Sequence, residues 1–208
     1  MVLEQLPEFP GDRPALESIR LGLDSHIQVY EWRGTDVILG RGTRLDPDIN
    51  LANCGADNIP VRRRLGGGGA VVLMPGVWVI TACYKKENKE INIPNTLERI
   101  ALEIASTLQQ LTGCVINLRG MGDLCLGEKK ILGSSLYLGR GALLYQGSLL
   151  VDADLRLIGR YLNHPSKEPA YRKGRSHEDF VTNLSQVCHV DTELMERMLI
   201  AALYRFKP

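Results

Sequence analysis

Apolar and polar residues alternate over several short stretches of the chain, and these stretches are rich in β-branched and aromatic types. This pattern is typical of β-strands. The segments predicted to be strands are residues 26–32, 37–40, 71–84, 115–126, 131–137 and 142–151. Turn residues divide two of them, since Pro75-Gly76 interrupts residues 71–84 and Gly120-Met121-Gly122 interrupts residues 115–126.

The clearest helix is predicted over residues 96–111, where apolar residues recur at spacings of three and four. Its apolar stripe consists of Leu97, Ile100, Ala101, Ile104, Leu108 and Leu111. Asn95 or Thr96 is expected to cap its start, and Gly113 to end it. Further helices are expected over residues 16–23, 50–58, 155–162 and 192–204. Asp191 would cap the last of these, whose apolar side would comprise Leu194, Met198, Ala201 and Ala202.

Strands joined mostly by hairpins, with a few separate helices, predict an α+β fold in which helices flank a mixed, mostly antiparallel sheet. Residues 1–13 are predicted to be an N-terminal arm, either disordered or loosely docked, and residues 14–208 a single domain. The basic run at residues 85–89 is expected to be a hairpin tip or a loop with a solvated surface.

Composition narrows the class of protein. A formal net charge of +1, with only three Phe and two Trp among 208 residues, argues against a nucleic-acid partner. Five cysteines without a C-x-x-C spacing argue against a disulfide framework and against a zinc site. The chain shows neither a targeting segment nor an apolar run long enough to cross a bilayer. We therefore expect a cytoplasmic protein with no membrane partner.

Four consecutive glycines, Gly66 to Gly69, follow the basic triplet Arg62-Arg63-Arg64. A glycine run lets backbone N–H groups face inward, and arginine adds charge-assisted hydrogen bonds, so this segment is a candidate anion site. The alternative is a flexible hairpin with a basic flank. The spacing fits neither a Walker loop nor a dinucleotide-binding fold.

A second candidate cluster surrounds Asp123, which follows the glycine-rich corner at residues 120–122. Its carboxylate either binds Mg²⁺ beside a nucleotide phosphate or caps a turn. Lys129 and Lys130 begin the next strand, so strand alternation directs one of them inward and the other to solvent. An inward lysine beside an anion-binding loop would be functional, whereas an outward one would be an ordinary surface residue.

At these residues the chain resembles the lipoate–protein ligases and octanoyltransferases of the biotin/lipoate protein-ligase superfamily. The resemblance covers roughly residues 28–185, with several motifs in the family's order. The segments that carry it are VILGRGTRLDPDINLANCGADNIPVRRRLGGGGAVV, GDLCLGEKKILGSS, YQGSLLVDADLRLIGRYL and KGRSHEDFVTNL. The chain looks most like a single-domain ligase without a C-terminal accessory domain, and its glycine run resembles the sulfur-oxidation-associated branch.

The resemblance implies a mixed sheet flanked by helices and two half-reactions in one site. Lipoate or octanoate attacks the α-phosphate of ATP, with Mg²⁺ present, to give acyl-AMP such as lipoyl-AMP. A lysine of a lipoyl-domain or other lipoate-binding carrier protein then takes the acyl group. A separate accessory subunit is a further partner that the resemblance allows.

The resemblance also assigns roles to residues. Lys130 matches the family's catalytic lysine, which stabilises developing negative charge and does not attack. Asp123 matches the aspartate near Mg²⁺. The residues implied to bind substrate or nucleotide are Arg63, Arg64, Gly67, Gly68, Gly69, Ala70, Val71, Gly76, Asp123, Gly133, Ser134, Gln146 and Gly147.

The chain departs from the family pattern at several positions where the family has polar residues. The replacements are Gly66, Leu73-Met74, Val77, Gly122 and Gln146. Two alternatives therefore stay open. One is ATP-independent octanoyl or lipoyl transfer from acyl carrier protein, for which Cys114 is the candidate nucleophile. The other is a non-catalytic acyl-binding subunit. Biotin ligation is less favoured, because the basic glycine loop of biotin ligases is missing from the sequence.

Overall fold

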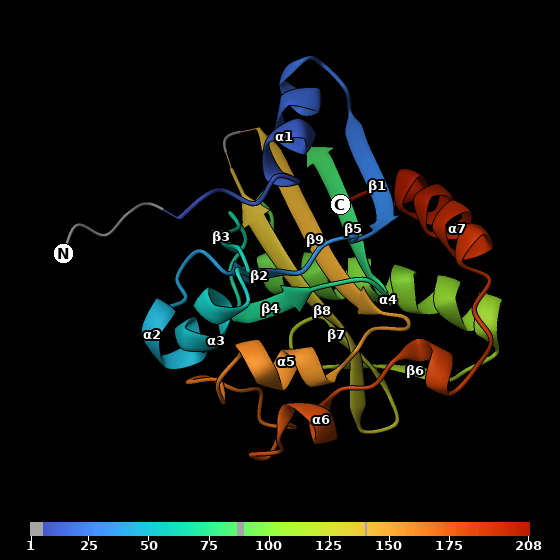
Figure 1. Cartoon of the computed structure of the whole chain (residues 1–208). Coiled ribbons are helices and arrows are strands. Elements are labelled where there is room, and N and C mark those ends of the chain that lie inside the picture. The colour runs from blue at the N-terminus through green and yellow to red at the C-terminus, as the bar shows by residue number, and fades with distance from the viewer. Residues whose placement is uncertain (1–5, 87–89, 140) are drawn as a thin grey trace.

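The computed structural model describes residues 6–86, 90–139 and 141–208, and its largest element is a six-stranded antiparallel sheet (Figure 1). The strand order is β1-β5-β9-β8-β7-β6. These strands are Ser25–Glu31 (β1), Val77–Lys85 (β5), Ile116–Arg119 (β6), Asp123–Leu126 (β7), Lys129–Leu138 (β8) and Ala142–Leu150 (β9). The hairpin connections predicted between neighbouring strands from β6 to β9 are present.

A smaller three-stranded sheet, in the order β3-β2-β4, carries the glycine run between two of its strands. Its strands are Asp36–Leu39 (β2), Val61–Arg63 (β3) and Ala70–Leu73 (β4). Strand β2 pairs in parallel with β3 and antiparallel with β4. The prediction of an α+β fold with a mixed, mostly antiparallel sheet is therefore confirmed.

Side chains that accept backbone N–H groups begin several of the helices, and these include Asn50, Asn92, Ser176 and Asp191. The described helices are α1 (Asp12–Arg20), α2 (Leu45–Asp48), α3 (Leu51–Ala56), α4 (Ile93–Thr112), α5 (Arg156–Tyr161), α6 (His177–Phe180), η1 (Leu184–Gln186, a 3-10 turn) and α7 (Thr192–Arg205). Among the described residues, no helix combines the length and the apolar character that crossing a bilayer requires.

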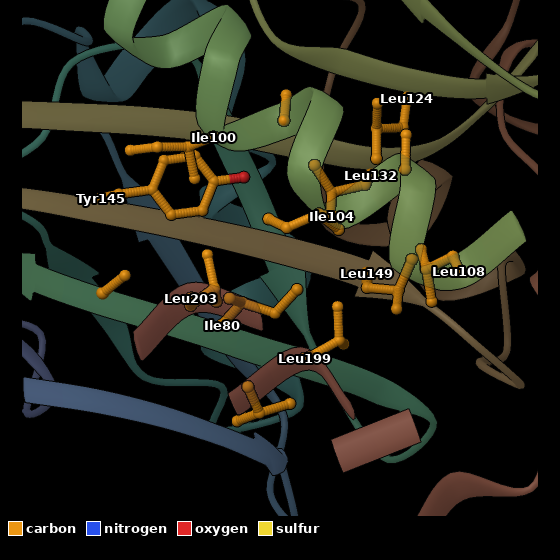
Figure 2. Packing of buried hydrophobic residues seen from close by; sticks show 14 of the residues in the cluster. Ile80, Ile100, Ile104, Leu108, Leu124, Leu132, Tyr145, Leu149, Leu199 and Leu203 are labelled. Carbon is orange, nitrogen blue, oxygen red and sulfur yellow. The ribbon is translucent and has the colours of Figure 1, made fainter. Parts of the chain in front are cut away.

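Helices α4 and α7 cover one face of the six-stranded sheet. Figure 2 shows Ile100, Ile104 and Leu108 of α4 packed against strand residues that include Leu132 and Leu149. The predicted apolar stripe of α4 is confirmed, because its members are buried or pack against this core. Burying a side chain of this size contributes about 1.5–3 kcal/mol, so this layer stabilises the frame on which the rest of the molecule is built.

The opposite face of the six-stranded sheet is covered by α1 and the three-stranded sheet. Alternate residues of β5 divide between the two faces: Ile80 packs on the α4 side, while Val79 joins the core of the smaller sheet and Cys83 packs under α1. A strand buried on both faces reads as a nearly continuous apolar run, as residues 77–84 do. The candidate site lies on this second face.

Several details differ from the sequence-based expectations. Helix α4 is capped by Asn92, three residues earlier than predicted, because Pro94 fits the first turn of a helix. In α7 the buried residues are Met195, Leu199, Ala202 and Leu203, so the apolar side was assigned about one residue off. The contact with α4 and β1, which local periodicity does not contain, selects the buried side.

The N-terminal arm is also more closely attached than expected from residue 6 onward. Phe9 is only 3% exposed and packs in the core of the smaller sheet, and its N–H donates to the carbonyl of Arg63 at 2.9 Å. Asp12 already belongs to α1, which begins four residues before the helix predicted at residue 16. The basic run predicted as a loop at residues 85–89 lies partly outside the described residues, and Lys85 is the last residue of β5.

Candidate functional site

A cavity of about 240 Å³ is lined by residues of both sheets and by the segment that carries α5 and α6. Its walls are mostly apolar, with Val72 and Leu73 from β4, Val79 from β5 and Leu150 from β9. The polar groups are concentrated at the glycine run, at Lys130 and along residues 163–177. An apolar cavity with a few convergent polar groups is the usual form of a small-molecule site.

The glycine run forms a loop whose carbonyl oxygens all have hydrogen-bond donors. The carbonyl of Gly66 accepts from the N–H of Arg41, and that of Gly68 from the hydroxyl of Thr43. The Arg64 guanidinium donates to the carbonyls of Gly67, at 2.8 Å, and Gly69, at 3.0 Å. The Gly69 carbonyl also accepts the N–H of Gly40. Within the described residues, the N–H groups of residues 66–69 donate to no protein acceptor. The loop therefore keeps its donors free and its acceptors occupied.

Arg64 holds this loop from inside the protein. The residue is 8% exposed, and a further donor of its guanidinium contacts the carbonyl of Ile38 at 3.3 Å. Burial lowers the pKa of the guanidinium to about 10, so it stays charged at neutral pH. Its Nε atom is buried without a partner among the described residues.

A β-bulge directs Lys130 into the cavity. Leu124 of β7 faces Leu132, but the next residue along β7, Cys125, faces Lys130, so Ile131 is an extra residue on β8. Regular alternation from Leu132 would have placed Lys130 on the α4 face of the sheet. Instead its Nζ lies 2.9 Å from the point where a Cβ on Gly133 would stand.

The Lys130 ammonium forms an ion pair with Asp123 at 2.8 Å between Nζ and Oδ1. The other carboxylate oxygen of Asp123 accepts the hydroxyl of Tyr171 at 2.8 Å, and the Tyr171 ring packs on Phe180 with centroids 5.2 Å apart. Burial and the neighbouring carboxylate raise the pKa of Tyr171, so its hydroxyl keeps its proton and remains a donor. Tyr171 thereby fixes the position of Asp123, and Asp123 fixes Lys130.

Asp12 does not line the cavity but binds Gln146, which does, and the sequence analysis did not predict this contact. It is 1% exposed, and its two carboxylate oxygens accept the N–H of Leu65 at 2.8 Å and the Nε2 of Gln146 at 2.9 Å. Burial raises the pKa of this carboxyl to about 6. The sequence offered no signal for it, because Asp12 precedes the first apolar position of its helix and fell within the segment predicted to be an arm.

The segment after α5 brings further cations to the cavity, and these too were not predicted individually. Lys167 and Arg172 both line the cavity with His177. Arg172 is 4% exposed, pairs with Glu168 at 3.5 Å and stacks over Phe180 at 4.8 Å. Burial lowers the pKa of His177, which keeps the imidazole neutral at neutral pH. The only sequence signal for this group was the motif starting at Lys173.

Most of the residues predicted for the site do line the cavity. These are Arg64, Gly68, Gly69, Ala70, Val71, Lys130, Gly133, Ser134, Gln146 and Gly147. Gly67 and Asp123 lie beside the cavity and do not line it. The Gly67 carbonyl accepts from Arg64, and Asp123 pairs with Lys130, and both of these partners line the cavity. The hydroxyl of Ser134 itself points away, to the carbonyl of Gly122 and to Tyr145.

Arg63 and Gly76 are not brought to the cavity. The guanidinium of Arg63 donates to the carbonyls of Gly40 and Thr43, so it organises the loop behind the glycine run. Gly76 lies in the turn before β5 with φ at +83°, and a Cβ there would stand 2.2 Å from the carbonyl oxygen of Asp152. Close backbone packing thus accounts for this glycine.

The family described as the lipoyl protein ligase A/B catalytic domain matches residues 16–204. A lipoate-protein ligase A of Psychrobacter cryohalolentis is 32% identical over 149 residues, covering 71% of this chain and 42% of that protein. A probable lipoate-protein ligase A of Mycoplasma pneumoniae is 29% identical over 136 residues, covering 65% of this chain and 39% of that protein. The chain therefore spans about two-fifths of the length of these relatives.

Solved structures share the fold. A bi-partite lipoate protein ligase from Thermoplasma acidophilum, described with its E2 lipoyl domain, has a TM-score of 0.76 at 23% identity, over 95% of this chain and 80% of that one. A lipoate-protein ligase A bound with ATP has a TM-score of 0.73 at 22% identity, over 95% and 82%. The sequence match over residues 16–204 and the shared fold lead to one conclusion: the chain belongs to the lipoyl protein ligase A/B catalytic domain family.

Proposed function

We propose that this chain catalyses the ATP-dependent attachment of lipoate, or octanoate, to a lysine of a lipoyl-carrier protein. The observation that carries the proposal is the glycine loop, whose donors are free and whose acceptors are occupied, at the edge of an apolar cavity that Lys130 also lines. The apolar walls suit a medium-chain acyl group, and the free N–H groups suit its carboxylate or a phosphate.

In the first half-reaction a carboxylate oxygen of the acid attacks the α-phosphate of ATP, and pyrophosphate leaves as the acyl–AMP anhydride forms. Negative charge develops on the phosphate oxygens. The Lys130 ammonium and the loop N–H groups stabilise that charge in a partly buried site, where such interactions are strong. Arg64 contributes indirectly, because it holds the carbonyls of Gly67 and Gly69 and so keeps the loop N–H groups in place.

In the second half-reaction the neutral amine of an acceptor lysine attacks the acyl carbon. An amide bond forms, the bond from the acyl carbon to the phosphate oxygen breaks, and AMP leaves. The Thermoplasma acidophilum protein with a similar fold is described with an E2 lipoyl domain, and we propose an acceptor of the same kind here. Lys130 holds the acyl oxygen and phosphate by charge and does not itself become acylated.

A magnesium ion fits this site only together with a phosphate. Within the described residues there is no group of three His, Cys, Asp or Glu side chains that could hold a metal ion. Asp123 offers one carboxylate, and Mg²⁺ in nucleotide enzymes is commonly held by one or two carboxylates plus substrate phosphates. When bound, the ion would neutralise phosphate charge, while Asp123 would hold it and Tyr171 would orient that carboxylate.

Transfer from acyl carrier protein is the alternative reaction, and it requires a cysteine nucleophile in the cavity. No cysteine of the described residues lines the cavity. Cys114 is half-buried just after the end of α4. The location of the thiols therefore favours the ligase reaction.

Pyrophosphate release tests the proposal. We expect release from ATP that depends on lipoate or octanoate but not on biotin, followed by acyl transfer to a purified lipoyl domain. If octanoyl carrier protein supported full transfer without ATP, and Cys114→Ala abolished it, the transferase would replace the ligase. Binding of the acids without any pyrophosphate release would instead identify a non-catalytic acyl-binding subunit.

A further inference from the structure

The N-terminal segment, residues 7–12, runs beside β3 like an additional short strand (Figure 1). Glu8 pairs in parallel with Arg63. The N–H of Arg63 donates to the carbonyl of Pro7, and the carbonyl of Arg63 accepts the N–H of Phe9, both at 2.9 Å. Strand β3 is an edge strand of the three-stranded sheet, with β2 on its other side. The N-terminal segment therefore lies along the outer edge of β3.

The backbone N–H groups that follow β3 alternate in direction, as they do along a strand. The N–H of Arg64 donates to the carbonyl of Leu39 in β2 at 2.9 Å, and the N–H of Leu65 points to the opposite side, toward the N-terminal segment. At this point the segment has already turned into α1, which begins at Asp12. The carboxylate of Asp12 supplies the acceptor and takes the Leu65 N–H at 2.8 Å. A side chain therefore replaces the backbone carbonyl that a longer strand would have provided.

The same carboxylate links the entry of the glycine loop to the six-stranded sheet. Leu65 directly precedes Gly66, and the second oxygen of Asp12 accepts the Nε2 of Gln146 on β9 at 2.9 Å. Gln146 pairs with Ser135 of β8. The loop touches β8 at the same place, since a Cβ on Gly66 would stand 2.7 Å from the Oγ of Ser135. Asp12 thus holds the loop entry over one defined point of the larger sheet.

This point has a fixed distance from Lys130 along β8. The Lys130 Nζ lies 2.9 Å from where a Cβ on Gly133 would stand, and Gly133 is two residues, or about 7 Å, from Ser135. The loop joins β3 to β4, whereas Lys130 belongs to β8, so the two groups come from different sheets. A link between the sheets at the loop entry therefore controls how the loop N–H groups stand relative to the Lys130 ammonium.

Asp12 is ionised when it makes this link at pH 7.5. The residue is 1% exposed, and burial raises the pKa of its carboxyl to about 6. The ionised form accepts both hydrogen bonds, and Arg64, which holds two loop carbonyls, is the nearby cation that favours it. A buried carboxylate whose pKa is raised lowers stability at neutral pH. Such a cost in stability is typical of functional sites.

We propose that Asp12 is a positioning residue for acyl-adenylate formation: it holds the entry of the glycine loop so that the loop N–H groups and Lys130 act on the same phosphate. This role rests on the proposed function for the reaction that the loop serves. Asp12 does not touch the substrate, since it does not line the cavity. Its loss should therefore displace donors that matter most where negative charge develops, which lowers kcat more than it changes KM.

Steady-state pyrophosphate release at pH 7.5, with ATP and lipoate, tests this role. In Asp12→Ala we expect kcat to fall about tenfold, with the KM for lipoate changed less than about twofold. In Asp12→Asn we expect kcat within about threefold of that of the unchanged protein. The asparagine oxygen still accepts the Leu65 N–H, and its amide nitrogen can donate to Gln146 once the Gln146 amide turns over. Recovery by this isosteric amide would identify the acceptor, rather than the charge, as what positions the loop.

Hydrogen exchange of the Leu65 amide, followed by NMR, reports on the contact itself. This amide should exchange slowly in the unchanged protein and in Asp12→Asn, and quickly in Asp12→Ala. Two control variants should keep the kcat of the unchanged protein. Glu17→Ala removes an exposed carboxylate from the same helix, and Leu203→Ala truncates a buried side chain of α7. Leu203→Ala should lower the urea midpoint, so it separates lost stability from lost positioning.

The possible outcomes separate this role from the proposed function. An unchanged kcat or an unchanged Leu65 exchange rate in Asp12→Ala would overturn the role. So would Asp12→Asn being as impaired as Asp12→Ala, or an equal loss of kcat in Leu203→Ala. If Asp12→Ala does not fold, Asp12→Ser takes its place, because the serine hydroxyl is one bond shorter than the carboxylate. If the unchanged protein releases no pyrophosphate, the proposed function falls, and the Leu65 exchange rate in Asp12→Ala decides whether Asp12 holds the loop.

Discussion

The glycine loop and the Lys130 corner both bring positive charge to the cavity, but they hold it in different ways. Arg64 is 8% exposed and donates to three backbone carbonyls, so its charge is used to build the loop. The Lys130 side chain is 24% exposed and pairs with one carboxylate. A cation bound to many fixed carbonyls is part of the fold, whereas a cation with one carboxylate partner can exchange it for a ligand. Substitutions at the two positions should therefore separate stability from activity.

Lys130→Ala should have the largest effect on activity. Removing a positioned charge from a site where negative charge develops costs about 10²–10³-fold in rate, and we expect that loss in pyrophosphate release. The free energy of unfolding should fall by about 1–2 kcal/mol, less than for Arg64→Met, because Asp123 loses Lys130 but keeps the Tyr171 hydroxyl as a partner. Lys129→Ala is the matched control, since Lys129 is next to Lys130 in the sequence and its side chain is exposed. Equal losses in both variants would contradict the role assigned to Lys130.

Arg64→Met should instead have its main effect on stability. The substitution removes the donor that the carbonyls of Ile38, Gly67 and Gly69 share, and we expect a loss of about 3 kcal/mol in the free energy of unfolding. Arg156→Met is a control, because that guanidinium is exposed and its ion pair among the described residues is with nearby Asp154. If Arg64→Met unfolded at the same urea concentration as the unchanged protein, the loop would not depend on this residue.

Asp12 sharpens the comparison because it couples stability to pH. Its carboxyl pKa is raised from 3.8 to about 6 in the folded protein. A raised carboxyl pKa stabilises the fold below pH 3.8, and that contribution is lost as pH rises through about 6. Relative to Asp12→Asn, the unchanged protein should therefore lose about 2.4 kcal/mol between pH 4 and pH 7. Urea unfolding of both proteins across this range measures it, and parallel curves would argue against the raised pKa.

Gly133→Ala should have the smallest effect. The new methyl group would stand 2.9 Å from Nζ and 3.0 Å from Cε of Lys130, a flexible side chain that can move aside. We expect activity to fall about tenfold, by displacement of the ammonium, with little change in stability. Gly159→Ala on α5 is the control, because a Cβ there meets no other atom within 4 Å. Unchanged activity in Gly133→Ala would show that the ammonium does not need its observed position.

Local patterns predicted those parts of the fold that depend on neighbouring residues. The apolar stripe of α4 and the break between β4 and β5 at Pro75-Gly76 were both correct for this reason. Strand β3 was missed because it has three residues, two of them arginines, and exists through its pairing with β2. The buried side of α7 was misassigned because contacts with other elements, rather than its own periodicity, select it.

In the site, too, the features carried by neighbouring residues were predictable and those that depend on long-range contacts were not. The glycine run and Lys130 stand out in the sequence, and both reach the cavity. The direction of Lys130 depends on the bulge at Ile131, which becomes visible only when β8 is paired with β7. Asp12 and Gln146 are 134 positions apart, and neither suggests the other until the fold brings them together.

The engagement of every carbonyl in the glycine loop also affects how its amides exchange with solvent. Loops are usually fast in hydrogen–deuterium exchange because they move, whereas here the peptide planes are held by Arg41, Thr43 and Arg64. The amides of residues 66–69 nevertheless lack protein acceptors among the described residues, so they should exchange quickly from a fixed loop. A bound anion would slow them without reshaping the backbone, which makes these four amides a reporter of occupancy built into the protein.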